Sequence, residues 1–136
     1  MRAAVQDALG AWLEGDADLL QLVTSMAEVY RAGLGELAVA LHGAGWRDGG
    51  SGMLDPLVEA LHARRPDPGA TPIDDTRMAV AMLHQAIALE PSYGPAFRRS
   101  AGFAAAPAAD RDATRRWWAS QLAHALGLGE GPGEDR

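Results

Sequence analysis

The feature that most restricts the fold of this chain is a run of large apolar residues in segment 17–43. They recur every three or four positions and are Leu19, Val23, Met26, Tyr30, Leu34, Leu37 and Leu41. This spacing places them on one face of an α-helix and forms a continuous seam for packing against another helix. Gly33 and Gly35 interrupt the run, and each costs about 1 kcal/mol of helix stability relative to alanine. The segment is therefore predicted to form one kinked helix or two helices broken near Gly33.

Shorter helical patterns fill the rest of the chain, and glycine or proline separates them. Helices are predicted over residues 3–14, 55–65, 74–90, 95–106 and 107–126, with Pro91 ending the third of these. No segment shows the sustained alternation of a β-strand. A chain of 136 residues has the length of one domain. We therefore predict an all-α single domain over residues 1–127, a compact bundle of six or seven helices with a glycine-rich loop at 43–53. Glycine and proline dominate residues 128–136, which predicts a disordered tail.

Three missing residue types exclude several classes of chemistry. The chain has no cysteine, which removes disulfides, thiolate nucleophiles, and cysteine-bound zinc or iron–sulfur sites. It has no lysine, which removes Schiff-base chemistry and the phosphate-binding loop lysine. It has no asparagine, which removes N-linked glycosylation. All cationic side chains other than histidine are therefore arginines.

Charge and hydropathy predict the cellular compartment of the protein and exclude some classes of binding partner. The formal net charge of −6 opposes general nucleic-acid binding. No apolar stretch approaches the length of about eighteen residues that a membrane-spanning helix needs, and the first residues lack a hydrophobic signal core. The sequence therefore predicts a cytoplasmic protein that binds neither nucleic acid nor membranes.

The charges are distributed unevenly along the chain. Residues 1–60 carry three arginines against nine acidic residues, whereas residues 94–126 carry five arginines against two aspartates. The two halves either form separate solvated faces or attract each other, within one molecule or between two molecules.

Residues 79–91 resemble the second helix of a tetratricopeptide repeat. That family places a small, a large apolar, a small and a proline residue at fixed spacing. The matching residues here are Ala79, Leu83, Ala86 and Pro91. Continuing the register over residues 79–124 assigns Phe97 to the next repeat's first helix, and Ala113, Trp117 and Ser120 to its second helix. The resemblance implies a scaffold that binds a partner segment in a groove, with Arg98 on the binding face, and implies no enzymatic activity.

The last predicted helix also fits a second register. Trp118, Leu122, Ala125 and Leu126 lie on one face, whereas the repeat register turns Trp117 inward. Neighbouring helical residues point about 100° apart, so either one indole is exposed or both lie at the edge of the core. An exposed tryptophan beside Arg115 and Arg116 would suit an interface, because tryptophan and arginine are common in binding hot spots.

Few residues suggest catalysis, and no cofactor is predicted. No serine lies in a Gly-x-Ser-x-Gly motif, and no pair among the four histidines has the i, i+4 spacing of a helical zinc site. Glu59 and His62 have the i, i+3 spacing of a di-iron bundle ligand pair. They are the candidate metal ligands if a dimer completes the site, and otherwise form an exposed polar pair.

Together these observations favour a non-catalytic helical protein–protein interaction module, such as an adaptor, assembly factor or regulator. It is expected to bind another protein, or a second copy of itself in a homodimer joined through the seam of residues 19–41. The candidate binding residues are Phe97, Arg98, Arg115, Arg116, Trp117 and Trp118. One alternative is a small all-α enzyme or ligand-binding protein with a metal half-site. Another is binding to nucleic acid or anionic membranes through residues 97–118, which the net charge opposes.

Overall fold

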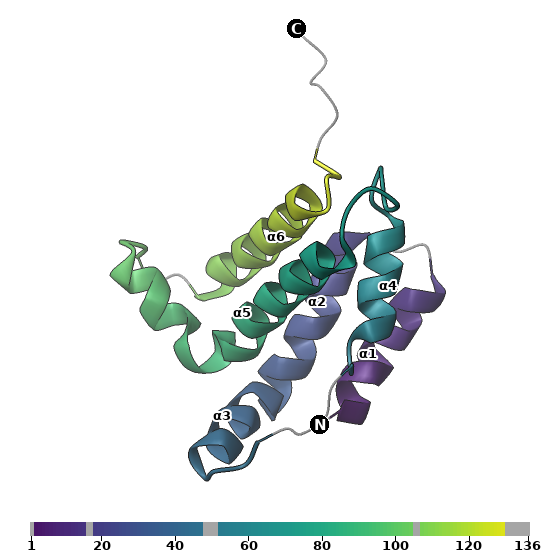
Figure 1. Cartoon of the computed structure of the whole chain (residues 1–136). Helices are drawn as coiled ribbons and strands as arrows, with labels where there is room; N and C mark the ends of the chain where they lie inside the picture. The colour runs from purple at the N-terminus through teal and green to yellow at the C-terminus, as the bar shows by residue number, and fades with distance from the viewer. Residues whose placement is uncertain (1, 16–17, 48–51, 105–106, 130–136) are drawn as a thin grey trace, which may run out of the picture.

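A computed structural model describes residues 2–15, 18–47, 52–104 and 107–129. The elements are α1 (Arg2–Glu14), α2 (Leu19–Val29), the π-helical turn η1 (Tyr30–Leu34), α3 (Gly35–Gly43), α4 (Asp55–Ala63), α5 (Ile73–Ser100) and α6 (Pro107–Ala125). Because α2, η1 and α3 follow one another without a gap, the described residues form five helical rods and no strand (Figure 1). The all-α prediction is confirmed, but the predicted number of six or seven helices is too high.

The predicted break at Pro91 is wrong, and this accounts for the lower number of helices. α5 runs through both Pro91 and Pro95 to Ser100. A proline inside a helix lacks the N–H that would bond to the carbonyl one turn earlier, and its ring bends the helix without always ending it. In Figure 1 the second half of α5 accordingly turns away from the first half before the chain returns as α6.

The segment that was predicted to form one kinked helix or two helices is continuous from α2 through η1 to α3, with a kink at Gly33. Asp18 caps its start by accepting a hydrogen bond of 2.8 Å from the backbone N–H of Gln21. Gly33 adopts a φ of 124°, a conformation that side-chain-bearing residues rarely take. The widened turn of η1 lies around this residue and directs α3 onto α5.

The core gathers the apolar faces of α1, α2, α4, α5 and α6. In Figure 1 α2 passes behind α5, with α1 and α4 on one side and α6 on the other. The buried apolar residues are Val5, Leu9, Trp12, Leu22, Val23, Met26, Ala27, Tyr30, Leu57, Val58, Leu61, Val80, Leu83, Ile87, Trp118, Leu122 and Leu126. Much of the predicted seam, including Val23, Met26 and Tyr30, therefore packs inside its own chain. Leu37 of the same seam is 48% exposed, and the homodimer stays a prediction.

The two irregular segments agree in part with the sequence prediction. In the predicted glycine-rich loop, α3 ends at Gly43, and residues 48–51 lie outside the described ranges. At the other end, Leu128 donates its backbone N–H to the carbonyl of Ala123 at 2.8 Å and packs against the core. Leu128 and Gly129 of the predicted disordered tail belong to the described residues, whereas residues 130–136 lie outside the described ranges. Among the helices described, none is both long and apolar enough to cross a membrane.

Candidate binding groove

A surface hollow of about 660 Å³ lies between α5 and α6 and is lined mainly by apolar side chains. Four of these are unusually exposed for their size, with exposed fractions of 55% for Met82, 64% for Phe97, 61% for Phe103 and 59% for Trp117. The remaining lining residues are Gln85, Ala86, Leu89, Glu90, Gly94, Arg98, Ala113, Thr114 and Trp118. Large apolar side chains gathered on a surface mark an interaction site more often than single exposed ones do. We call this hollow the apolar groove.

The two tryptophans of α6 take different places in this groove. Trp118 is buried together with Leu122 and Leu126, while Trp117 on the neighbouring helical position is exposed. The second register of the sequence analysis, with Trp118 inward, is therefore the one that the helix adopts. Both side chains line the apolar groove, Trp118 as a buried residue and Trp117 as an exposed one.

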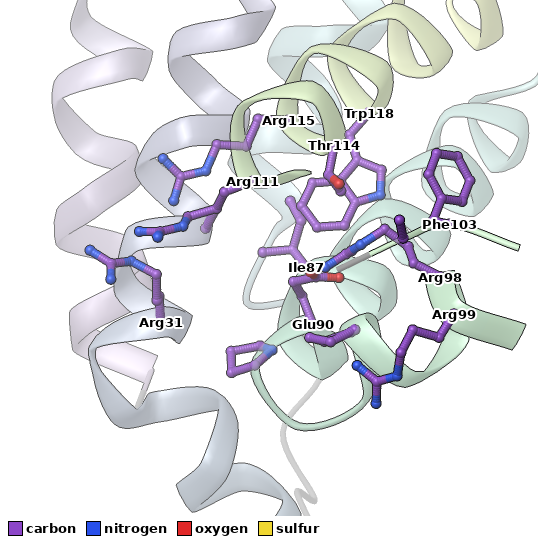
Figure 2. Close-up of a pocket in the computed structure, with 14 residues that line it drawn as sticks. Arg31, Ile87, Glu90, Arg98, Arg99, Phe103, Arg111, Thr114, Arg115 and Trp118 are labelled. Carbon is purple, nitrogen blue, oxygen red and sulfur yellow. Dashed lines mark ion pairs between the residues drawn. The ribbon is translucent and has the colours of Figure 1, made fainter. Parts of the chain in front are cut away.

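A smaller pocket of about 240 Å³ continues the apolar groove at one end and is surrounded by arginines. It shares residues such as Arg98, Thr114 and Trp118 with the groove. Its arginines come from η1, from the end of α5 and from α6, as Figure 2 shows, and are Arg31, Arg98, Arg99, Arg111 and Arg115. Buried residues such as Ala27, Ile87 and Trp118 also line it. We call this hollow the arginine pocket.

Glu28 forms ion pairs with two of these arginines. Its carboxylate accepts hydrogen bonds from Nη2 of Arg115 at 2.6 Å and from Nη2 of Arg31 at 3.1 Å. The hydrogen bond from Arg115, followed by that from Arg31, lowers the pKa of Glu28 below its usual value. Glu28 belongs to the acidic half of the sequence and Arg115 to the basic half. At this contact, therefore, the two halves attract each other within one molecule.

Glu90 forms an ion pair with Arg98 across the bent part of α5. The two residues lie two helical turns apart, and Glu90 Oε1 is 2.6 Å from Arg98 Nη1. Gly94 lies between them, and a Cβ atom at this position would collide with the Glu90 carboxylate. The missing side chain therefore leaves the space through which Glu90 reaches Arg98. Within the described residues, the buried Nε–H of Arg98 has no hydrogen-bond acceptor.

Arg99 and Arg111 differ from the other arginines of the pocket. Within the described ranges neither of them forms an ion pair or a side-chain hydrogen bond. The five guanidinium groups are thus balanced by only two carboxylates among the residues described, those of Glu28 and Glu90. The arginine pocket keeps an excess of positive charge although the whole chain is acidic.

The structure brings most of the predicted binding residues together. Phe97, Arg98, Trp117 and Trp118 line the apolar groove, and Arg115 lines the arginine pocket. Arg116 is exposed and lines neither hollow. That these residues bind a partner stays a prediction.

Sequence reasoning missed several lining residues, for two different reasons. Met82, Gln85 and Leu89 form a stripe with i, i+3, i+7 spacing beside the core face of α5, and this second stripe could have been found. Arg31 comes from a distant segment, and no local pattern places it beside Arg111.

Of the two candidate metal ligands, His62 takes part in a hydrogen-bonded contact between α4 and the residues that follow it. His62 Nε2 lies 2.9 Å from the carbonyl of Pro68, so this nitrogen carries the hydrogen and donates it. His62 Nδ1 then accepts from the buried hydroxyl of Thr76 at 2.8 Å, and that hydroxyl accepts from Arg65 Nε at 2.8 Å. Both ring nitrogens are engaged, and Glu59 is exposed on α4. In the part of the chain that the structure describes, no group of three metal-ligating side chains occurs.

Tyr30 and His84 form a second buried polar contact, between η1 and α5. The Tyr30 hydroxyl is hydrogen-bonded to His84 Nε2, and the ring centroids are 5.4 Å apart. Burial raises the pKa of Tyr30 to about 12 and lowers the pKa of His84. Both groups are therefore neutral at pH 7, with Tyr30 donating and His84 accepting. Among the described residues no carboxylate is bonded to His84, so the pair lacks the orienting group of a catalytic histidine.

The resemblance to tetratricopeptide repeats is supported only in its helical character. Under that register Ala113, Trp117 and Ser120 would face inward, but all three are exposed. The helical hairpin that it places around Pro91 is instead one continuous bent helix. Comparisons of the chain with protein-family models, curated proteins and solved structures found no match, so they identify neither this repeat nor another family.

Proposed function

We propose that this protein is a non-catalytic interaction module that binds an amphipathic, acidic segment of another protein in the apolar groove. The observation that carries the proposal is the exposure of Met82, Phe97, Phe103 and Trp117 around one hollow between α5 and α6. More than half of each of these side chains is exposed to water. Covering them with apolar side chains of a ligand stabilises the complex by removing apolar area from water.

The shape of the groove supports a helical segment as the ligand. The groove is bounded by two helices that the chain joins as a hairpin, α5 and α6, and its apolar residues extend along both. A helix with apolar residues at i, i+3, i+4 and i+7 is a common ligand of such a surface, because its apolar face fits between two rows of side chains. Phe97 and Trp117 are the large aromatic anchors that such interfaces favour.

The charge around the groove supports an acidic segment. The apolar groove continues into the arginine pocket, where Arg99 and Arg111 have no carboxylate partner in the described ranges. Complementary charge accelerates the encounter of two molecules and disfavours partners of the wrong sign. A segment with leucines on one face and glutamates on the other satisfies both parts of the surface.

Fluorescence anisotropy with two synthetic peptides tests this proposal. Both peptides carry leucine on one helical face, and the other face carries glutamate in the first peptide and lysine in the second. We expect the glutamate peptide to bind the full chain saturably and the lysine peptide to bind at least about tenfold more weakly, a difference that a few charge pairs supply. Equal binding of both peptides, or no binding of either, would overturn the proposal.

Matched variants locate the binding surface. Phe97→Ala and Trp117→Ala should each weaken binding of the glutamate peptide by about tenfold or more, as loss of an aromatic anchor does. Leu20→Ala and Leu37→Ala also truncate exposed apolar side chains, but on α2 and α3, where they do not line the groove. These two controls should leave the affinity unchanged. If all four variants weakened binding equally, the peptide would not be bound in the apolar groove.

A further inference from the structure

We propose that the arginine pocket is an anion-binding subsite that takes a doubly charged oxyanion, either one phosphate group or two adjacent carboxylates. The inference deepens the proposed function and rests on it for the identity of the molecule that carries the anion. The binding of the anion itself follows from the pocket alone.

Two of the five arginines in the pocket have no carboxylate partner in the described part of the chain, and this favours a ligand with two negative charges. Glu28 already occupies Arg31 and Arg115, and Glu90 occupies Arg98. Arg99 and Arg111 then remain as two positive charges without a partner in the described part of the chain. A single carboxylate balances one of them, whereas a dianion balances both. Arginine also suits this role because its planar fork of N–H donors matches the oxygens of carboxylate and phosphate.

Arginine donors lie on two sides of the pocket. In Figure 2 Arg31, Arg111 and Arg115 lie on one side, and Arg98 and Arg99 lie on the other, with Ile87 and Trp118 between them. The hydroxyl-bearing Thr114 lies between these two groups of arginines on the pocket lining. The buried Nε–H of Arg98 lacks an acceptor among the described residues, a state that folded proteins rarely leave unfilled. An oxyanion in the pocket is a group that supplies such an acceptor.

Buried apolar residues around the pocket strengthen the electrostatic attraction between its arginines and a bound anion. Trp118, Ile87 and Ala27 are buried and bring apolar surface to its lining. The side chain of Arg115 is only 11% exposed, so part of the positive charge is shielded from water. Electrostatic interactions are stronger where water is excluded, because the local dielectric is lower.

The test is a titration of the full chain with inorganic phosphate, followed by NMR of the tryptophan indole N–H groups. Trp118 lines the pocket and should shift saturably. Trp12, whose indole donates to the carbonyl of Asp18 at 2.9 Å, does not line it and serves as the internal reference. Acetate, a single carboxylate, should bind at least about tenfold more weakly than phosphate. Equal effects of acetate and phosphate, or no saturable shift of Trp118, would overturn the inference.

Two double variants separate the pocket from the general charge of the protein. Arg99→Gln/Arg111→Gln removes the two unpaired cations and should weaken phosphate binding by about tenfold or more. Arg2→Gln/Arg77→Gln changes the net charge equally, but these arginines are exposed and line neither hollow. This control pair should leave the affinity unchanged. An equal loss in both double variants would indicate unspecific attraction and overturn the inference.

A parallel titration with malonate distinguishes the sources of the anion. Binding of malonate comparable to that of phosphate supports paired carboxylates, such as neighbouring acidic side chains of the bound segment. Binding of phosphate alone supports a phosphorylated side chain. Because these titrations contain no peptide, failure of the subsite is separate from failure of the apolar groove. A peptide that binds while phosphate does not would overturn only the subsite.

Discussion

Tyr30 and His84 form a polar contact inside an otherwise apolar interface. Tyr30 is almost fully buried, and its hydroxyl bonds to a histidine more than fifty positions away. Burial penalises the charged form of each group, so the pKa of Tyr30 rises and that of His84 falls. The pair joins η1 to α5 as two neutral groups, and the fold depends on both remaining neutral.

The free energy of unfolding should therefore fall as the pH rises from about 10 to about 12. In the unfolded chain Tyr30 loses its proton near pH 10, whereas the folded chain keeps it up to about pH 12. Between these values the unfolded state binds fewer protons, so folding loses stability, by on the order of 2 to 3 kcal/mol at the upper end. Denaturant unfolding at several pH values measures this change.

Phenylalanine variants provide the control. Tyr30→Phe should abolish most of the alkaline loss and lower stability at pH 7 by about 1 kcal/mol, because the hydrogen bond is lost. Tyr93→Phe changes an exposed tyrosine and should behave like the unchanged chain. Since the chain contains neither lysine nor cysteine, few other side chains titrate in this range. Identical alkaline curves for Tyr30→Phe and the unchanged chain would contradict the assignment.

At the scale of the elements, a glycine contact determines how closely α3 approaches α5. A Cβ atom on Gly35 would lie 2.8 Å from the backbone oxygen of Ala88 and 3.0 Å from Cγ of Pro91. The first of these neighbours is backbone and cannot turn aside as a flexible side chain can. The close packing of α3 on α5 thus requires glycine at position 35, beside the bend in α5.

Replacing Gly35 by alanine has two opposite effects on the free energy of unfolding, one from helix propensity and one from packing. Gly35→Ala gains the helix propensity of alanine, but the overpacked contact should lower the free energy of unfolding by about 1 to 3 kcal/mol. Gly10→Ala on α1 is the matched control, because nothing lies within 4 Å of a Cβ atom there. It should raise stability by up to about 1 kcal/mol. Urea denaturation of both variants measures the difference, and a stabilising Gly35→Ala would show that the helices are not in close contact.

At the scale of the whole molecule, Glu28 connects the two oppositely charged halves of the chain. It also reduces the positive charge of the arginine pocket, since Arg31 and Arg115 both donate to it. The Glu28 side chain is 46% exposed, so solvent screens these ion pairs and limits their contribution to stability. Its larger effect should be on what the pocket binds.

Glu28→Gln is therefore expected to change ligand binding more than stability. The free energy of unfolding should fall by less than about 1 kcal/mol. Affinity for phosphate should rise severalfold, because Arg31 and Arg115 lose a competing carboxylate and the attraction to an anion increases. Glu59→Gln removes an exposed carboxylate from α4 and should leave phosphate affinity unchanged. An affinity that fell in Glu28→Gln would mean that Glu28 positions the guanidinium groups instead of competing with the ligand.

The sequence by itself determined the helical class and most helical faces of this protein. Apolar spacing is a local property, and at i, i+4, i+7 and i+8 it predicts that Val5, Leu9, Trp12 and Leu13 form the buried face of the first helix. Val5, Leu9 and Trp12 are buried, whereas Leu13 is 36% exposed. It also left two registers for α6, and one of them, with Trp118 inward, is the one adopted. Local spacing could not choose between these registers, because Trp117 and Trp118 are equally apolar and only contact with α2 and α5 distinguishes them.

Only the tertiary structure decided where the helices bend and which distant residues meet. The sequence predicted that one helix ends at Pro91 and that another begins at Pro95, but α5 continues through both prolines. A proline removes single hydrogen bonds, while the helix packs on its neighbours along its whole length. The arginine pocket joins Arg31 of η1 to residues of α5 and α6. Its composition depends on the distortion at Gly33 and on the angle between helices. Both depend on how side chains of different segments pack together, and the periodicity of a single segment carries no information about that packing.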